Sequence, residues 1–243
     1  MITGASSGIG AALAQRLAAH GAAVALAARR DEALRHVAER CGADAQPIVA
    51  DVTRRDDVER IVHECIARFG RIDVWVNNAG QGLTRMPTEL TDDDIDTMMR
   101  ANVKSVIYGM QAVLPHFKER ASGHIINISS MLGRVPSAVF RSAYSASKHY
   151  VDAITAMFRE EVQQTHPGIQ ISLVSPGVVY TDFGLNARHG GVDSRRIPGG
   201  QTAEEVAAVI ARVIDDRRPD VYTRPGAQRQ IAEYYAAIGV DPG

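Results

Sequence analysis

The sequence predicts a doubly wound α/β fold, in which helices cover both faces of a mostly parallel sheet. Short apolar runs that suit strands alternate along the chain with segments whose apolar residues recur at helical spacing. The chain has 243 residues, 45% of them hydrophobic and 23% charged, which is enough for a large core without disulfides or metals. We therefore expect residues 1–243 to form a single domain.

The elements follow in order from these runs. The expected strands are 22–27, 46–52, 72–76, 124–129 and 169–174. The expected helices begin near residue 31 and then cover 54–69, 142–164 and a final segment that carries residues 206–214. Asp31 is expected to cap its helix, and the acidic run Asp92–Asp94 is expected to start another helix, where acids suit the helix dipole, and not to bind a metal.

Composition and charge exclude several classes of protein. The net charge of −1 and the 5% content of aromatic residues argue against nucleic acid as a partner. No apolar run is long enough to span a membrane, and the N-terminus lacks the pattern of a signal peptide, so we expect a cytoplasmic protein that does not bind membranes. The two cysteines form neither a disulfide framework nor a zinc cluster, and no metal site is expected.

One segment, residues 182–200, breaks the regular alternation. It holds five glycines and several charges without any period. A loop of this length in a compact domain is usually functional or disordered. We interpret 182–200 as a mobile substrate lid, the alternative being a surface insertion, and expect its His189 to be solvated.

The N-terminus carries a glycine-rich phosphate loop with the spacing Gly-x3-Gly-x-Gly, followed by an alanine-rich helical pattern. Glycines let the backbone approach a pyrophosphate, and the helix N-terminus offers free N–H groups to the anion. The expected contact residues are Gly4, Ser6, Ser7, Gly8, Ile9 and Gly10. Only Met1 and Ile2 precede the loop, which is short for a strand, and we expect the true start to lie upstream.

The end of the second expected strand indicates which dinucleotide binds. A carboxylate at this point holds the ribose 2′-hydroxyl of NAD, whereas an arginine accommodates the 2′-phosphate of NADP. Here Arg29 and Arg30 follow the strand and no acid stands in the expected place. The sequence therefore predicts NADP(H), with NAD(H) as the alternative, unless the arginines are only a solvated turn.

Tyr144 and Lys148 are four residues apart on an expected helix and so share one face. A neighbouring ammonium favours the phenolate and is expected to lower the pKa of the tyrosine from its ordinary value of about 10. A tyrosine tuned in this way can exchange a proton with a carbonyl or alcohol oxygen.

Read together, five motifs resemble the short-chain dehydrogenase/reductase family in its compact single-domain branch. They are Thr3-Gly4-x3-Gly8-x-Gly10, Asn77-Asn78-Ala79-Gly80, Ser129-Ser130, Tyr144-x3-Lys148 and Pro176-Gly177-x-Val179-x-Thr181, in this order. The resemblance covers the chain up to Thr181. It implies a Rossmann-type fold and hydride transfer between a nicotinamide and a carbonyl or secondary alcohol, carried out by a homodimer or homotetramer.

The resemblance also implies a role for each matching residue. Tyr144 would be the general acid/base, Lys148 would bind the nicotinamide ribose, Ser130 would hold the substrate oxygen, and Asn102 would hold a relay water. The remaining cofactor contacts would be Asp51, Val52, Asn78, Ala79, Gly80, Pro176, Gly177, Val179 and Thr181. The family serine usually stands thirteen positions before the tyrosine, which is Met131 here, so we infer a one-residue insertion between Arg134 and Ser142, with Ser129 as the reserve candidate.

The substrate side is less patterned. Six residues are expected to make the pocket apolar and to favour a hydrophobic ketone or alcohol over a charged acid: Met131, Leu132, Val139, Phe140, Phe183 and Leu185. Two alternatives stay open, a non-catalytic dinucleotide-binding regulator and an epimerase or dehydratase on the same fold.

Overall fold

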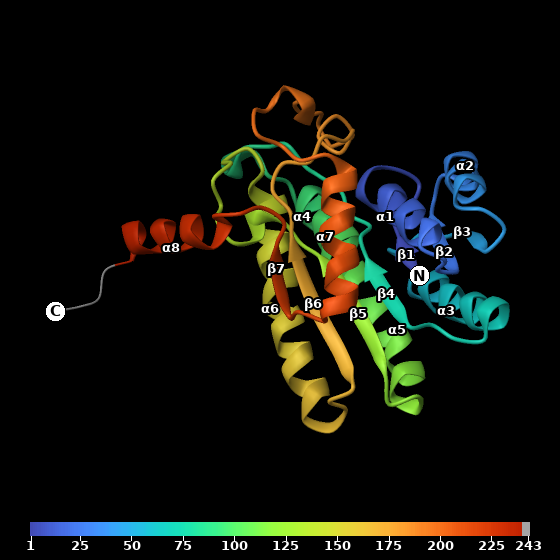
Figure 1. Ribbon diagram of the computed structural model, residues 1–243. Coiled ribbons are helices and arrows are strands. Elements are labelled where there is room, and N and C mark those ends of the chain that lie inside the picture. The colour runs from blue at the N-terminus through green and yellow to red at the C-terminus, as the bar shows by residue number, and fades with distance from the viewer. Residues whose placement is uncertain (240–243) are drawn as a thin grey trace.

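Seven parallel strands run through the middle of the protein in the order β3-β2-β1-β4-β5-β6-β7 (Figure 1). The computed structural model describes residues 1–239. The strands are β1 (Ile2–Thr3), β2 (Val24–Ala28), β3 (Ala45–Val49), β4 (Val74–Asn77), β5 (Gly123–Ile128), β6 (Ile169–Ser175) and β7 (Asp220–Tyr222). The order reverses between β1 and β4, and ligands of open α/β sheets bind at this point, beyond the carboxyl ends of the strands. The predicted doubly wound fold is confirmed.

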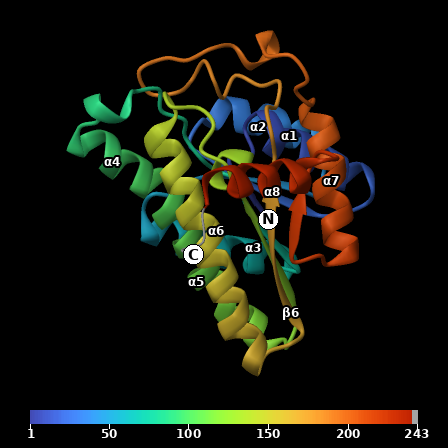
Figure 2. The same cartoon turned by 90° about the vertical axis from the view of Figure 1, so that its left-hand side faces the viewer.

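Helices cover both faces of the sheet (Figures 1 and 2). On one face α1 (Gly8–Ala19) packs between α2 (Asp31–Cys41) and α7 (Ala203–Asp216). On the other face lie α3 (Arg55–Phe69), α5 (Ser105–Glu119) and α6 (Ser142–Thr165). Side chains alternate along a strand, so Leu26 of β2 packs in the core under α1, α2 and α7, and Ala25 and Ala27 pack in the core under α3, α5 and α6. Because both faces of β2 are covered, all of its residues are buried and are small or aliphatic.

The acidic run at residues 92–94 starts a helix, as predicted. Thr91 caps α4 (Asp92–Met98), and its side chain exchanges hydrogen bonds with Asp94 in a capping box. The helix continues through a π-helical turn (Met99–Lys104) into α5. π-helical turns are rare and often occur at functional sites, and this one carries Asn102. Asp31 differs from its expected role: it is the first residue of α2 and pairs with Arg35 at 2.6 Å, while Arg30 is the cap position.

The C-terminal helix α8 (Ala227–Ile238) projects away from the sheet in Figure 1 and crosses in front of it in Figure 2. The Tyr235 hydroxyl donates a hydrogen bond to the Arg134 carbonyl at 2.9 Å and so ties this helix to the loop after β5. Neither α8 nor β7 was predicted. The short helical turns Pro87–Glu89, Met131–Gly133 and Ser194–Arg196 complete the description.

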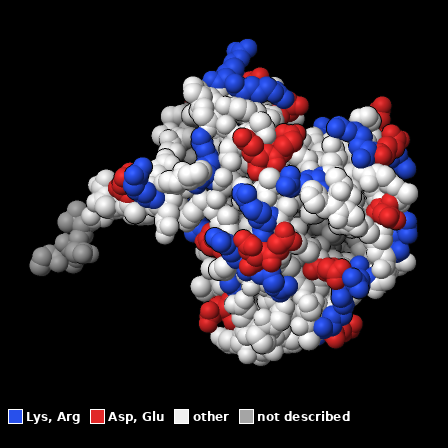
Figure 3. Space-filling model, viewed as in Figure 1, with Lys and Arg blue, Asp and Glu red and all other residues white. Residues whose placement is uncertain are grey.

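Acidic and basic side chains are interspersed on the face shown in Figure 3, in keeping with a net charge of −1. Within residues 1–239, no helix has both the length and the apolar character needed to cross a bilayer.

Candidate active site

A groove of about 640 Å³ runs along the carboxyl ends of the strands on both sides of the switch point between β1 and β4. It is lined by the predicted residues Gly4, Ser6, Ser7, Gly8, Ile9, Arg29, Arg30, Asp51, Val52, Asn78, Ala79, Gly80, Ser130, Tyr144, Lys148, Pro176, Gly177, Val179 and Thr181. Two predicted residues, Gly10 and Asn102, lie behind its wall. Sequence reasoning missed Thr53, Gln81, Gly82, Thr97, Arg100, Asp182 and Asn186, which line the groove but belong to no motif.

The phosphate loop requires glycine for steric reasons. Gly4 has a φ of +65°, and a Cβ there would lie 2.8 Å from the Cα of Ala79. A Cβ at Gly10 would lie 2.6 Å from both the Asn78 side-chain nitrogen and the Gly4 carbonyl oxygen. Gly10 therefore lets α1 approach the loop closely enough to aim its free N–H groups into the groove.

Asn78 locks the phosphate loop to the end of β4. Its side-chain nitrogen donates to the carbonyl oxygens of Thr3 at 2.9 Å and Gly4 at 3.3 Å. In return, the Thr3 hydroxyl accepts from the backbone N–H groups of Asn78 and Ala79. These bonds hold the two sides of the switch point together and fix the floor of the groove.

Arg30 reaches over the phosphate loop from the end of β2. Its guanidinium donates hydrogen bonds to the hydroxyls of Ser6 at 3.0 Å and Ser7 at 2.7 Å, and the side chain is otherwise exposed. Because Arg29 and Arg30 both line the groove, its end beside β2 is basic. Asp51, at the end of β3, accepts hydrogen bonds from the backbone N–H and the hydroxyl of Thr53.

Tyr144 and Lys148 both lie on the buried face of α6 and point into the groove. The Lys148 ammonium donates to the Ile128 carbonyl at 2.8 Å and lies 5.8 Å from the centre of the Tyr144 ring. Burial raises the pKa of Tyr144 to about 12, opposed by the Ser130 hydroxyl and the Arg141 charge. Burial also lowers the pKa of Lys148 to about 8. The expected fall in the tyrosine pKa does not occur, because desolvation outweighs the neighbouring charges.

Asn102 is fully buried, and its side-chain amide forms hydrogen bonds with neighbouring segments. Its oxygen accepts from the Gln81 backbone N–H at 2.8 Å, and its nitrogen donates to the Gln81 carbonyl and to the Ser147 hydroxyl, each at 3.0 Å. A Cβ at Gly80 would lie 3.2 Å from the Asn102 oxygen and 3.8 Å from the Lys148 amine, so these three residues are neighbours. Asn102 thus joins the loop after β4 to α6 directly behind the groove.

The two serines after β5 have different environments. Ser130 lines the groove and accepts a hydrogen bond from the Leu132 N–H at 3.1 Å. The Ser129 hydroxyl donates to Asp152, which also pairs with Arg134 at 2.9 Å. Burial raises the pKa of Asp152 to about 6. Because the Ser129 hydroxyl is engaged in this cluster, the geometry favours Ser130 for a contact with substrate.

A second cavity of about 830 Å³, which we call the pocket, adjoins the groove between the loop after β5, the lid segment (182–200) and α8. Five residues line both cavities: Ser130, Tyr144, Gly177, Val179 and Phe183. The Phe183 ring packs edge-on against the Tyr144 ring with 5.6 Å between the centroids. Met131, Leu132 and Phe140 line the pocket as expected, whereas Val139 and Leu185 are exposed and lie outside the lining.

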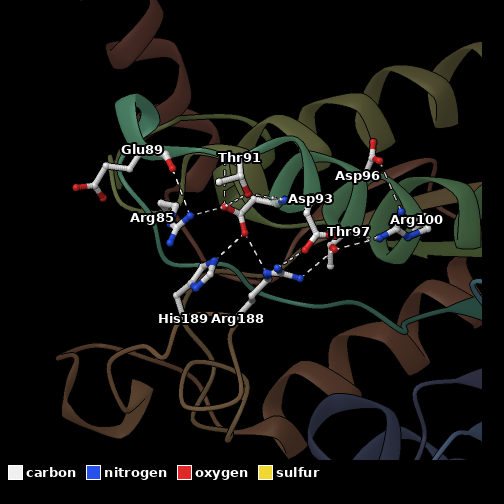
Figure 4. Close-up of polar contacts among 10 residues, drawn as sticks. Arg85, Glu89, Thr91, Asp93, Asp96, Thr97, Arg100, Arg188 and His189 are labelled. Atoms are coloured by element: carbon white, nitrogen blue, oxygen red, sulfur yellow. Dashed lines mark hydrogen bonds and ion pairs between the residues drawn. The ribbon is translucent and has the colours of Figure 1, made fainter.

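The lid segment is anchored to α4 through a buried carboxylate (Figure 4). Asp94, fully buried, accepts hydrogen bonds from His189 at 2.7 Å and Arg85 at 2.9 Å, and the Arg188 guanidinium lies 2.9 Å from it. The bonds from His189 and Thr91 hold the pKa of Asp94 well below its ordinary value. His189 is exposed, as expected, but one of its ring nitrogens also bonds the Asp94 carboxylate, a contact that the sequence did not predict.

The comparisons with known proteins agree with this geometry. The short chain dehydrogenase family matches residues 1–190. An uncharacterized oxidoreductase of Staphylococcus aureus is 34% identical over 228 residues, which cover 93% of this chain and 96% of that protein. A metagenomic short-chain oxidoreductase solved in complex with NADP is 31% identical, with a TM-score of 0.76 over 92% of this chain and 95% of its own. The 3-ketoacyl-(acyl-carrier-protein) reductase from Brucella melitensis, solved with NADH, is 26% identical, with a TM-score of 0.82 over 91% of this chain and 95% of its own.

The chain therefore belongs to the short-chain dehydrogenase/reductase family, whose members are NAD(P)-dependent oxidoreductases that act on CH–OH and C=O groups. The predicted family membership is confirmed.

Proposed function

We propose that this protein is an NADP(H)-dependent oxidoreductase that interconverts a carbonyl group and a secondary alcohol on a largely apolar substrate. One observation carries the proposal. Ser130 and Tyr144 line both the groove and the pocket, so a hydroxyl and a phenol stand where a dinucleotide in the groove would meet a substrate in the pocket. Catalysis of hydride transfer requires this juxtaposition.

The residues of the groove fit a nicotinamide dinucleotide. The close approach of Gly10 to Asn78 leaves the N-terminus of α1 free for a pyrophosphate, and Arg30 supports the β2 end. Lys148 and Tyr144 stand at the other end, close to the loop that carries Pro176 and Gly177. When bound, this cofactor supplies or accepts the hydride.

The side chains of the site would then supply the proton that the carbonyl oxygen needs during reduction. With a pKa of about 12, the Tyr144 phenol keeps its proton at neutral pH and can donate it to the carbonyl oxygen during reduction. The Ser130 hydroxyl would donate a hydrogen bond to the same oxygen and stabilise its developing charge. Lys148 would hold the ribose hydroxyls and keep a positive charge beside Tyr144, and Asn102 would fix the wall behind them. In the reverse direction the deprotonated form of Tyr144, the phenolate, would take the proton from the alcohol.

A screen of ketones and secondary alcohols with NADPH, NADH and their oxidised forms tests this function through the absorbance of the nicotinamide. We expect turnover with part of the panel, and loss of about 10²- to 10⁴-fold in kcat for Ser130→Ala and Tyr144→Phe. Cofactor binding without turnover on any member of the panel would contradict the proposal and favour the non-catalytic alternative.

The preference for NADP rests on Arg29 and Arg30, both of which line the groove at the end of β2. A charge-assisted bond to a 2′-phosphate favours NADPH by about 10- to 100-fold. We therefore expect Arg29→Asp and Arg30→Asp to lower the NADPH/NADH ratio of kcat/KM by such factors, and the exposed Arg40→Asp to leave it unchanged. An unchanged ratio in both groove variants would refute the NADP assignment.

A further inference from the structure

Two arginines line the pocket beside Tyr144. Arg141 is the N-cap residue directly before α6, three positions before the tyrosine, and Arg224 follows β7. The two side chains are partly buried, and they approach the pocket from different segments of the fold. Neither belongs to a motif, so sequence reasoning did not select them.

Both arginines lack a carboxylate partner among residues 1–239, whereas three other partly buried arginines have one. Arg134 pairs with Asp152, and both Arg85 and Arg188 pair with Asp94. By contrast, within the described part of the chain the Arg141 guanidinium donates only one long hydrogen bond, of 3.4 Å to the Leu83 carbonyl, and lies 5.8 Å from the centre of the Phe140 ring. Neither Arg141 nor Arg224 forms an ion pair within 4.0 Å there. A partly buried cation without a counter-charge loses hydration that the protein does not replace.

Glycines from three places leave room for the Arg141 guanidinium. A Cβ at Gly82 would lie 3.0 Å from its Nη1, and a Cβ at Gly191 would lie 2.9 Å from its Nη2, with Gly184 also close at 3.7 Å. The guanidinium therefore sits between the loop after β4 and the lid segment, at the edge of the pocket. Burial lowers the pKa of Arg141, yet its ordinary value is so high that the charge persists at neutral pH.

Arg224 lies beside Gly177. A Cβ at Gly177 would lie 2.9 Å from its Cδ, and Gly177 stands where the groove and the pocket meet. Of the other charged residues in the lining, Arg229 and Glu233 offset each other at 3.7 Å on α8. The pocket therefore carries an excess of two positive charges among apolar residues such as Phe140 and Val178.

We propose that the substrate of this enzyme carries a carboxylate or phosphate group on an otherwise apolar body, and that Arg141 binds this anion while Arg224 adds attraction. The inference rests on the proposed function and narrows it. It departs from the sequence-based expectation of a hydrophobic ketone or alcohol, which weighed the apolar residues of 131–140 and of the lid segment but not the position of the arginines. A planar guanidinium with several free N–H donors suits a bidentate oxyanion.

Matched substrates test the proposal in the NADPH-loaded enzyme. The probes are 6-oxoheptanoate against its methyl ester, and 4-oxopentyl phosphate against the corresponding alcohol, 5-hydroxypentan-2-one. We expect wild-type kcat/KM to favour at least one anion over its neutral partner by about 10- to 100-fold, and the pair that shows it identifies the carboxylate or the phosphate.

Charge-removing variants assign the effect to the pocket. Because Arg141 also influences the pKa of Tyr144, the anion/neutral ratio is the readout, since an effect on proton transfer cancels in it. We expect Arg141→Gln to bring the ratio close to one, Arg224→Gln to lower it less, and Arg212→Gln, an exposed arginine of α7 outside both cavities, to leave it unchanged. A wild-type ratio near one for both pairs, or a ratio unaffected by Arg141→Gln, would overturn the proposal.

A binding measurement separates this inference from the proposed function. Calorimetric titration of heptanoate, heptanamide and pentyl phosphate into the NADPH-loaded protein needs no turnover. Tighter binding of an anion than of the amide, lost in Arg141→Gln, supports the inference even if no carbonyl is reduced, in which case only the proposed function fails. Equal binding of all three compounds, together with reduction of the neutral ketones, would overturn the inference and leave the proposed function standing.

Discussion

The groove and the pocket meet at Tyr144 but are built in different ways. The floor of the groove is formed largely by backbone and short side chains at the ends of neighbouring strands. Hydrogen bonds such as those between Asn78 and Thr3 fix these strand ends relative to one another. The pocket is formed by long side chains from the loop after β5, the lid segment and α8, and two of its arginines have no carboxylate partner among residues 1–239. The groove, where the dinucleotide would bind, is therefore held by internal hydrogen bonds, whereas the pocket, where the substrate would bind, has fewer such constraints.

Among the changes that affect only one of the two regions, the largest effect is expected from disrupting the groove at Gly10. In Gly10→Ala the new Cβ would lie 2.6 Å from two fixed atoms, so α1 must shift away from Asn78. Overpacking of this kind costs about 1–3 kcal/mol of unfolding free energy. We expect a similar loss in the free energy of NADPH binding, which raises its Kd by about 5- to 100-fold.

Chemical denaturation and fluorescence titration of NADPH measure the two quantities. Ala19→Val, at an exposed position of the same helix, is the matched control and is expected to change neither by more than about 0.5 kcal/mol. Wild-type NADPH affinity in Gly10→Ala would show that the close approach of α1 does not shape the groove.

A smaller effect, confined to the pocket, is expected on releasing the lid segment. Asp94→Asn removes the charge that holds Arg85, Arg188 and His189, and we expect KM for the substrate to rise about 3- to 10-fold while the Kd of NADPH stays unchanged. Hydrogen exchange of the lid amides should accelerate in parallel. Asp96→Asn, which loosens an exposed pair with Arg100 at 3.8 Å, is the control. Equal changes in the KM for the substrate and in the Kd of NADPH would show that Asp94 does not act on the pocket separately from the groove.

The same anchor has a defined pH dependence. Because folding lowers the pKa of Asp94 below its unfolded value of about 3.9, its stabilising contribution is complete above that value and is lost as the pH falls through the folded-state pKa. We expect the protection factors of the lid amides, in which the intrinsic pH dependence of exchange is divided out, to fall only under such acidic conditions. A loss of protection that already starts near neutral pH would contradict this assignment.

The smallest effect concerns Lys148 and its neighbour Asp152. With a pKa of about 8, Lys148 loses its charge as the pH rises through that value, and we expect the affinity for NADPH to fall with it. The charge of Asp152 raises the pKa of Lys148, so Asp152→Asn should move the midpoint to lower pH by about one unit or less. Titrations of NADPH between about pH 6 and pH 10 measure it. A midpoint that moves upward would reverse the sign of this coupling.

The sequence was most informative where a motif and a local pattern coincide. Strands such as β5 and β6 are rich in isoleucine and other apolar residues because both of their faces are buried. The phosphate loop is recognisable in the sequence because the backbone geometry requires its glycines. The helix at Asp92 was predictable because its capping box is local. In these parts the residues that determine the local structure are close together in the sequence, so the pattern alone predicts the element.

The sequence was least informative where placement depends on distant residues. His189 and Arg188 belong to an irregular segment, and only the fold brings them to Asp94, about 95 positions earlier. Arg141 resembles an ordinary helix-flanking residue until the glycines of two other segments are seen around it. The direction of the Tyr144 pKa also depends on burial, which the spacing of Tyr144 and Lys148 does not reveal.

The account depends on Tyr144 as the proton donor at the junction of groove and pocket, and one measurement tests this most directly. In Tyr144→Phe, single-turnover reduction of an accepted ketone and the Kd of NADPH are measured on the same preparation. We predict a rate lower by about 10²- to 10⁴-fold with a Kd within about twofold of the wild type, because the missing hydroxyl acts on the substrate oxygen. A wild-type rate, with or without a change in Kd, would contradict the central claim.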